Sequence, residues 1–191
     1  MKGVVRFLSK RHLMSKRNLS SLMAADRVGE ELQVPVAAER SPNEKTVALF
    51  FQLINRHRIQ EIAAQCFAPN GTIAFQNMST AIGEFCTEME SIVMSFPNFD
   101  ISFTTIAEKS FGIVVVEDGV ATGTHTGAAY GFGPFPPVAK SHRTVRNDPE
   151  RYEFHLDENQ RITHCRVCCR DEGALSGPAG FYEQVGGFPC L

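Results

Sequence analysis

Asp171 is a residue whose type and position could support acid–base chemistry. In the segment RITHCRVCCRD, strand alternation places it on one face with three apolar or weakly polar residues, Cys165, Val167 and Cys169. A carboxylate in such company loses hydration, and its pKa rises because burial penalises the charged form. A carboxyl group that titrates nearer to neutral pH can donate or accept a proton in catalysis. Asp171 is therefore a candidate general acid or base; alternatively, it caps the following turn or pairs with Arg170 or Arg143 on the surface.

His125 is a second candidate, because it lies between two threonines in the segment GTHTG (residues 123–127). On a strand the imidazole alternates with Gly123 and Gly127 and points toward the face that they leave open. Open space beside the ring suits either a bound ligand or a bulky side chain from a neighbouring strand. The pattern favours packing over catalysis, and the sequence alone leaves both interpretations open.

Other candidates would bind a ligand rather than act on it. The segment AAYGFGPFPP supplies an aromatic rim over a predicted pocket through Tyr130, Phe132 and Phe135. Phe85 and Met89 belong to the apolar stripe of a predicted helix, which is typical of a core but could also line a pocket. His155 alternates with Tyr152, Phe154 and Leu156. If those three pack inward, His155 faces outward with Glu153; in the opposite orientation it joins the cavity.

The six cysteines do not form a recognisable metal site. Cys165 and Cys168 form a CxxC, but alternation puts Cys168 on the face opposite to Cys165 and Cys169. A metal-binding CxxC needs a tight turn that brings both sulfurs to one point, and usually a second ligand pair, which the sequence does not offer. We therefore expect reduced, mostly buried thiols, no metal and no cofactor.

Charge is distributed unevenly along the 191 residues. The first 20 residues carry six Lys or Arg and no acid, which leaves thirteen bases against twenty-one acids in the remainder, a net charge near -8. The net negative charge of the chain after residue 20 argues against nucleic acid as a partner. The basic, serine-bearing N-terminus resembles a mitochondrial presequence, and its apolar residues are too interrupted for a secretory signal or a membrane span. We expect the mitochondrial matrix; the alternative is a disordered basic tail on a cytoplasmic protein.

The sequence predicts a targeting segment and linker over residues 1–40 and one α+β domain over 41–191. A first helix starts after Ser41, with Pro42 at its first position and Glu44 completing a capping box. A second helix covers residues 59–67, and a third runs from residue 79 or 80 to 96. From residue 100 the period changes to two, which indicates strands, with turns at 117–119 and 157–159. A last helical turn is expected over 181–187.

Five segments in order carry a resemblance to a known family: FPNFDISF, VATGTHTG, the glycine/proline loop, YEFHLDENQRITH and RDEGALSGPAGFYEQVGG. Together they resemble the SnoaL-like polyketide cyclases, in the nuclear-transport-factor-two-like superfamily. The resemblance implies a cone, in which a curved antiparallel sheet packs around N-terminal helices and encloses an apolar cavity. It also implies a homodimer through the open sheet face, where Arg166 and Arg170 would lie. The family's acid/base aspartate matches Asp171, which would remove a proton alpha to a carbonyl without cofactor or metal.

The sequence departs from the family at two places near the expected cavity mouth. Asn147-Asp148-Pro149 interrupts a strand, since proline cannot donate to a ladder, so a bulge, loop or edge is expected there. The aromatic loop at 128–137 is also longer than usual, so the family's substrate is not carried over. We expect a small apolar or carbonyl-containing ligand and a cyclase, isomerase or lyase reaction. The alternative is a non-catalytic carrier or dimerising module whose cavity is filled by aromatic side chains: Phe50, Phe51, Phe85, Phe96 and Phe103.

Overall fold

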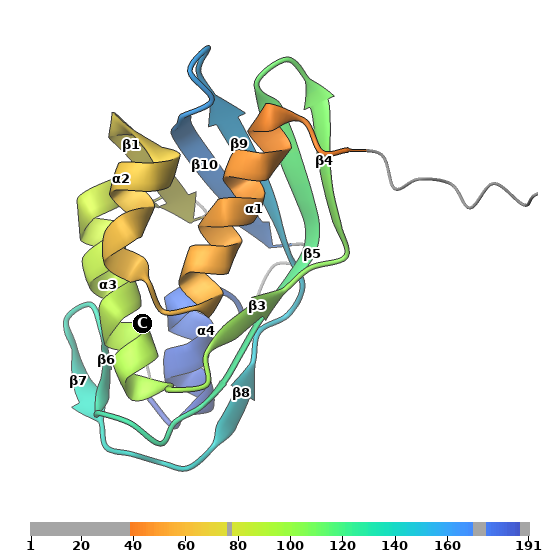
Figure 1. The fold of residues 1–191 in the computed structure, drawn as a ribbon. Coiled ribbons are helices and arrows are strands. Elements are labelled where there is room, and N and C mark those ends of the chain that lie inside the picture. Colours follow the sequence, from red (N-terminus) through yellow and green to blue (C-terminus); the bar gives the residue numbers. More distant parts are fainter. Residues whose placement is uncertain (1–38, 76–77, 170–174, 188–191) are drawn as a thin grey trace, which may run out of the picture. The chain divides into compact units, whose positions relative to one another are not determined.

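The computed structural model describes residues 39–75, 78–169 and 175–187. Contacts group the chain into units 1–38 and 39–191, and every described residue lies in the second unit. In this unit, three helices cover the concave face of a curled sheet, and a fourth closes its lower end (Figure 1). The architecture is α+β, as the sequence predicts.

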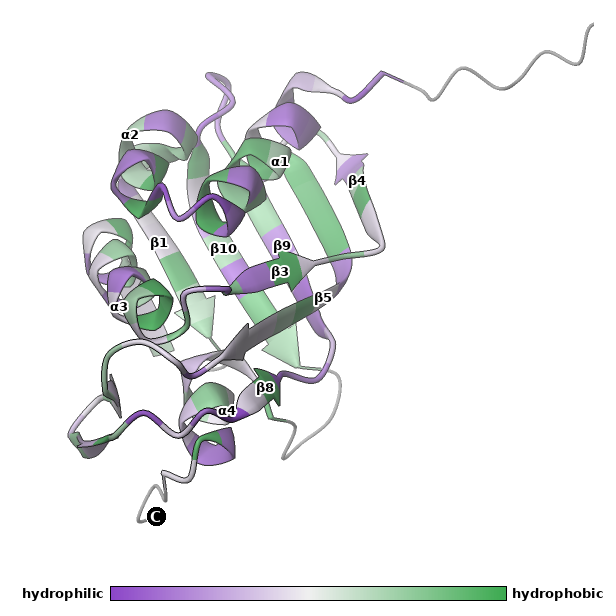
Figure 2. Ribbon diagram, turned by 60° about the horizontal axis from the view of Figure 1, so that its bottom comes forward, coloured by the Kyte–Doolittle hydropathy of each residue, from purple (hydrophilic) through white to green (hydrophobic). Residues whose placement is uncertain are grey.

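The first helices form where capping and apolar spacing predict them. Helix α1 (Pro42–Asn55) begins with a complete capping box: Ser41 Oγ accepts from Glu44 N at 3.1 Å, and Glu44 Oε2 accepts from Ser41 N at 2.9 Å. The short 3-10 helix η1 (Ile59–Glu61) and helix α2 (Ile62–Cys66) occupy the predicted second helical segment. These helices turn their apolar sides toward the sheet and their hydrophilic sides outward (Figure 2).

Two helix boundaries differ from the prediction. Helix α3 (Ile82–Ser95) starts later than predicted, because Met78–Ala81 pairs as strand β2 with strand β1 (Phe67–Phe75). Helix α4 (Gly177–Gln184) starts four residues before the predicted helical turn, with Pro178 in its first turn, a position that proline favours. In both cases tertiary pairing or local backbone geometry, rather than apolar spacing, determines where the helix begins.

The main sheet has the order β2-β1-β10-β9-β5-β3, and β4 and β8 also pair with β5. Among the strands of the described residues, β1 and β10 pair in parallel, and the other pairs in this sheet are antiparallel. A separate hairpin joins β6 to β7. The remaining strands are β3 (Asp100–Ser102), β4 (Thr105–Ser110), β5 (Ile113–Thr124), β6 (Tyr130–Phe132), β7 (Phe135–Val138), β8 (Thr144–Arg146), β9 (Glu150–Leu156) and β10 (Ile162–Cys169).

The predicted turn at residues 117–119 is wrong. Strand β5 continues through it, and Asp118 adopts a left-handed φ of 55° while the pairing of β5 with β9 shifts register at this point. A bulge absorbs the extra residue without ending the strand. The β4–β5 turn lies earlier, at Gly112, whose φ is 75°. The predicted turn at 157–159 and the strand break at 147–149 are both confirmed.

Glu108 on β4 fastens α1 to the sheet. Its carboxylate accepts from Ser41 Oγ at 2.6 Å, from Asn43 Nδ2 at 2.7 Å and from Gly112 N at 3.0 Å. These hydrogen bonds, led by the one from Ser41, lower the pKa of Glu108. A lowered pKa in the folded state means that the carboxylate stabilises the fold above its unfolded-state pKa, and that this contribution disappears as pH falls through the folded-state value.

Glu108→Gln is therefore expected to reduce the free energy of unfolding at pH 7 by about 1–2 kcal/mol, the typical value of charge-assisted hydrogen bonds. Urea unfolding at pH 7 and near pH 3 measures the effect, which should shrink at the lower pH. Glu158→Gln, in the exposed 157–159 turn, is the matched control and should change little. A loss of stability that is equal at both pH values would contradict a role for the ionised carboxylate.

Candidate functional site

The curled sheet, α1, α3 and α4 surround a small hollow, here called the inner cavity, with a volume of about 50 Å³. Its walls are mainly apolar and come from helices (Phe50, Ile54, Phe85, Met89, Phe181) and from strands (Ile73, Cys165, Val167). Three polar side chains also line it: Asn147, Glu150 and Tyr152. Polar groups that converge in an apolar hollow are typical of a binding or active site.

Glu150 is the buried carboxyl group of the inner cavity. It is the first residue of β9, directly after the break at 147–149, and it is only 2% exposed. Its Oε2 accepts from Tyr152 Oη at 2.6 Å, and its Oε1 accepts from Gly177 N at 2.6 Å. Burial raises the pKa of Glu150, against the opposing effect of these hydrogen bonds. The result is a carboxyl group with a raised pKa inside an apolar site, the condition for acid–base use near neutral pH.

Tyr152 holds one side of this carboxyl group. Its ring packs edge-on against Phe51, with centroids 5.3 Å apart, and the side chain is 5% exposed. Gly119 on β5 makes room for the ring, because a Cβ there would lie 2.3 Å from Tyr152 Cε2. Burial and the neighbouring Glu150 raise the pKa of Tyr152, so its hydroxyl stays protonated and available as a donor.

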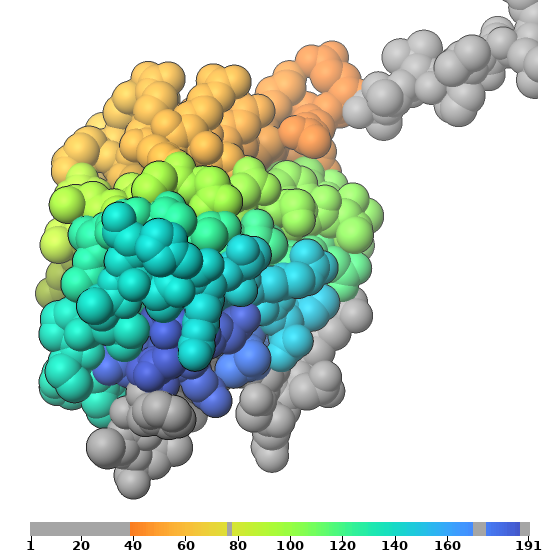
Figure 3. Space-filling view, turned by 90° about the horizontal axis from the view of Figure 1, so that it is seen from below, coloured from red at the N-terminus to blue at the C-terminus, as the bar shows by residue number. Residues whose placement is uncertain are grey.

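Asn147 holds the start of α4 against the other side of the site. Its Nδ2 donates to the Gly177 carbonyl at 3.0 Å, and its Oδ1 accepts from Gln184 Nε2 at 3.2 Å. Gly177 has a φ of 54°, which few residues other than glycine adopt. Seen from below, α4 lies against the parts of the chain that carry β6 and β8 (Figure 3). The helix therefore forms the lower wall of the cavity, where Pro178 and Phe181 line it.

A larger hollow of about 280 Å³, here called the vestibule, adjoins the inner cavity. The two share four lining residues: Phe75, Val167, Gly177 and Pro178. The vestibule adds polar groups, among them Ser79, Thr80, Glu88 and Ser176. Burial and the nearby Glu84 raise the pKa of Glu88. The vestibule is thus wider and more polar than the cavity behind it.

Three of the sequence-predicted ligand residues line these hollows. Phe85 and Met89 line the inner cavity, and Phe132 lines the vestibule. Tyr130 is 2% exposed, and its hydroxyl donates to the Pro178 carbonyl at 3.0 Å; its ring borders a further groove between α3 and β6. Phe135 stacks on Tyr182, with centroids 5.9 Å apart. Tyr130 and Phe135 therefore support α4 and the hairpin beside the vestibule.

The structure places His125 within the packed interior, with none of its surface exposed. Its Nε2 lies 2.9 Å from the Ala128 carbonyl, an acceptor only, so Nε2 carries the proton. Nδ1 then accepts from the backbone N–H of Ser141 at 3.3 Å. The space beside Gly123 is filled by Phe96, whose Cβ would lie 3.0 Å from a Cβ on that glycine. A bulky side chain thus fills the space beside His125, but it comes from the C-cap of α3 and not from a neighbouring strand. His125 lines none of the hollows described here.

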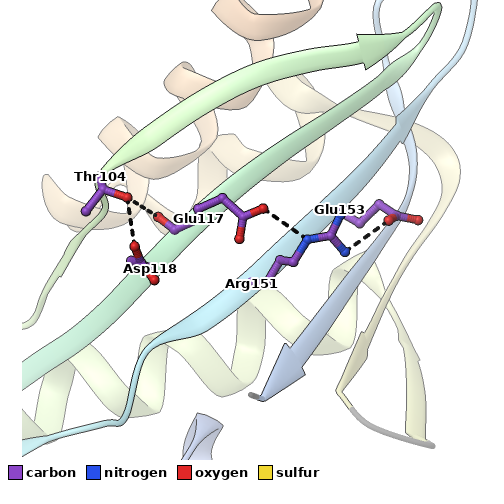
Figure 4. Close-up of polar contacts among 5 residues, drawn as sticks. All are labelled: Thr104, Glu117, Asp118, Arg151 and Glu153. Atoms are coloured by element: carbon purple, nitrogen blue, oxygen red, sulfur yellow. Dashed lines mark hydrogen bonds and ion pairs between the residues drawn. The ribbon is translucent and has the colours of Figure 1, made fainter.

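His155 faces the outside of the sheet, because its neighbours Tyr152 and Phe154 are buried inward. Its Nε2 lies 3.0 Å from Glu153 Oε1. On this face a row of charges crosses two strands: Arg151 Nε contacts Glu117 Oε1 at 3.2 Å, and Arg151 Nη1 contacts Glu153 Oε2 at 3.3 Å (Figure 4). His155 therefore faces outward with Glu153, on the opposite side of the sheet from the inner cavity.

Asp171, the predicted acid or base, lies outside the described residues. The last residue of β10, Cys169, pairs with Glu150 across the ladder. As predicted, Cys165 and Cys169 share the inner face, since both line the hollows, and Cys168 pairs with the outward-facing Arg151. Sequence reasoning missed Glu150, although alternation back from Tyr152 and Phe154 would have placed it on the inner face.

Within residues 39–75, 78–169 and 175–187, no group of three or more His, Cys, Asp or Glu could hold a metal ion. Across the same ranges, no helix is long and apolar enough to span a bilayer.

No family model matches the sequence, and no curated protein matches it. Solved structures do share its fold. AclR from Streptomyces galilaeus, assigned as a hydroxylase, is 13% identical over 78% of this chain and 83% of its own, with a TM-score of 0.57. A protein from Jannaschia assigned as a SnoaL-like polyketide cyclase is 20% identical over 68% of this chain and 89% of its own, with a TM-score of 0.54. IdmH from Streptomyces antibioticus, assigned as a polyketide cyclase, is 16% identical over 68% and 91%, with a TM-score of 0.52. The chain thus has the cone-shaped α+β fold of the SnoaL-like polyketide cyclases, as its sequence motifs predict.

Proposed function

We propose that the inner cavity binds the reacting end of a small, largely apolar carbonyl compound, and that Glu150 acts on it as a general acid or base. The reaction class is a cofactor-independent cyclisation, isomerisation or lyase step that moves a proton alpha to the carbonyl. The observation that carries the proposal is a 2% exposed carboxyl group with a raised pKa lining an apolar cavity. Asp171 is a second candidate for the same role, on its sequence position alone.

The hydrogen bonds around Glu150 support proton transfer in both directions. In its ionised form the carboxylate takes the alpha proton, and the C–H electron pair becomes the carbon–carbon double bond of an enolate. Tyr152, whose hydroxyl donates to Glu150 Oε2 at 2.6 Å, then donates to the enolate oxygen, which has taken up the former C=O π electron pair. Gly177 N continues to donate to Oε1, so the carboxyl group keeps its orientation throughout.

Exchange of alpha protons tests this proposal without knowledge of the natural substrate. The protein is incubated with 2-butanone in deuterium oxide, and deuterium incorporation is followed by NMR. We expect catalysed exchange that Glu150→Gln reduces by about 10²–10⁴-fold, the usual contribution of a general base. Asp171→Asn is measured in parallel. Loss only with Asp171→Asn would assign the role to Asp171, and an absence of catalysed exchange would overturn the proposal.

The same fold could instead serve as a ligand carrier or dimerising module. The small volume of the inner cavity favours this alternative, because Phe50 and Phe85 already occupy much of the interior.

We propose a homodimer through the outer sheet face, where Glu117, Arg151 and Glu153 alternate in charge and Arg166 is exposed. Light scattering should give twice the monomer mass for the wild type and a lower mass for Arg166→Glu; a wild-type monomer would contradict this proposal.

Residues 1–40 are proposed to direct the protein to the mitochondrial matrix. Their fusion to a fluorescent protein should localise to mitochondria, and a fusion with Arg6, Arg11 and Arg17 replaced by Gln should not. Diffuse fluorescence from the unmodified fusion would instead favour the cytoplasmic alternative.

A further inference from the structure

Phe75 stands at the boundary between the inner cavity and the vestibule. It lines both hollows, together with Val167, Gly177 and Pro178, and these four residues are here called the neck. The half-buried ring of Phe75 stacks on Phe85, with centroids 6.4 Å apart and planes inclined by 22°. On the opposite side of the neck, a Cβ at Gly177 would lie 3.3 Å from Phe75 Cδ1. The ring therefore fills the space between α3 and the start of α4.

The two hollows differ greatly in capacity. The inner cavity, at about 50 Å³, has room for roughly three to five water-sized groups, since one such group needs about 10–15 Å³. The vestibule, at about 280 Å³, is more than five times larger and carries hydroxyl and carboxyl groups among apolar side chains. A carbonyl carbon, its oxygen and one methyl group fit the inner cavity, whereas a ring system or two alkyl chains do not.

We propose that Phe75 determines specificity by admitting only the small terminal end of an elongated substrate. The substrate class is a compound whose carbonyl group stands one or two atoms from its end. That end reaches Glu150 through the neck. The longer remainder lies in the vestibule, against Phe132, Met78 and the polar side chains that line it. This inference rests on the proposed function in assuming that the carbonyl group must approach Glu150.

Two isomeric ketones test the inference by binding alone. 2-Nonanone and 5-nonanone have the same composition, but the carbonyl group is near one end in the first and at the centre of the second. We expect 2-nonanone to bind at least about tenfold more tightly, because 5-nonanone must either keep its carbonyl group out of the inner cavity or force a butyl chain through the neck. Dissociation constants are measured by chemical-shift titration of the isotopically labelled full-length protein.

Variants of the neck separate a size effect from general loss of structure. Phe75→Ala should bring the two dissociation constants to within about threefold of each other, and Phe75→Leu, which keeps most of the apolar surface, should give an intermediate ratio. The matched control is Phe103→Ala, since Phe103 is also a half-buried phenylalanine, packs on Phe51 at 4.9 Å and lines neither hollow. That variant should keep the wild-type ratio.

The outcomes distinguish this inference from the proposed function. Equal binding of both ketones to the wild type, or no measurable binding of either, would overturn the inference. So would a ratio that Phe75→Ala leaves unchanged or that Phe103→Ala alters equally. Catalysed exchange in 2-butanone tests Glu150 without a long chain having to pass the neck, because that ketone is small enough for the inner cavity. Equal binding of the two ketones to the wild-type protein, with catalysed exchange retained, would therefore overturn only the role of Phe75.

Discussion

Glu150→Gln is expected to raise the free energy of unfolding at pH 8 while it reduces alpha-proton exchange by about 10²–10⁴-fold. Burial raises the pKa of Glu150 in the folded protein. A carboxyl group with a raised folded-state pKa stabilises the fold below its unfolded-state pKa, and this contribution is lost as pH rises through the folded-state value. Gln carries no charge to desolvate, and its amide can still accept from Gly177 N and donate to Tyr152 Oη. The gain should be on the order of 1–2 kcal/mol, as for removal of a buried charge with retained hydrogen bonding.

Glu153→Gln is the matched control for this prediction. It lies on the same strand but on the outer face, and the hydrogen bond from His155 lowers its pKa, with a smaller contribution from Arg151. Its carboxylate should therefore stabilise the fold at neutral pH, and its replacement should reduce stability slightly at pH 8. Denaturant unfolding of both variants at pH 5 and pH 8 provides the comparison. If Glu150→Gln destabilised the protein more at pH 8 than at pH 5, Glu150 would be an ionised anchor for α4 and not an acid–base group.

His125→Ala is expected to reduce the free energy of unfolding by about 3–5 kcal/mol, the range for loss of a large buried side chain. The ring is fully buried and packs against Phe96, with centroids 5.1 Å apart. Its removal also leaves the Ala128 carbonyl and the Ser141 N–H without their partner, which adds an unsatisfied-group penalty. Urea unfolding measures the loss.

His155→Ala, on the half-exposed outer face, is the control and should change stability by less than about 1 kcal/mol. Because His125→Ala is expected to be strongly destabilised, the conservative variant His125→Asn, which is expected to fold, tests whether His125 takes part in catalysis. Alpha-proton exchange per folded molecule should be unchanged in it. A variant that keeps its stability but loses exchange would return His125 to the catalytic candidates.

Much of the fold was predictable from the sequence, because helix caps and strand alternation depend on residues that are close together in the chain. The capping box at Ser41 and Glu44 located α1, and alternation assigned the faces of Cys165, Cys168 and Cys169 correctly. The turn predicted at residues 117–119 failed because a single left-handed residue, Asp118, lets β5 continue as a bulge. No period-two or period-3.6 pattern encodes such a local backbone choice.

The site was less predictable, since it depends on contacts between distant segments. Alternation indicates that Glu150 faces inward with Tyr152, but the pairing of its carboxyl group with Gly177 N joins residues 27 positions apart. The neck likewise brings together Phe75 of β1, Val167 of β10 and Pro178 of α4. Its width follows from the packing of these elements, so the size of the inner cavity could not be inferred from composition.

The pKa of the Glu150 carboxyl group is the measurement that tests the central claim most directly. Carboxyl-carbon NMR titration of the labelled protein gives the value, and Glu150→Gln assigns the resonance. The account predicts a pKa clearly above the ~4.3 of a free glutamate. A value at or below ~4.3 would mean that Glu150 is a solvated or ion-stabilised carboxylate that holds the start of α4, and it would contradict acid–base function at this site.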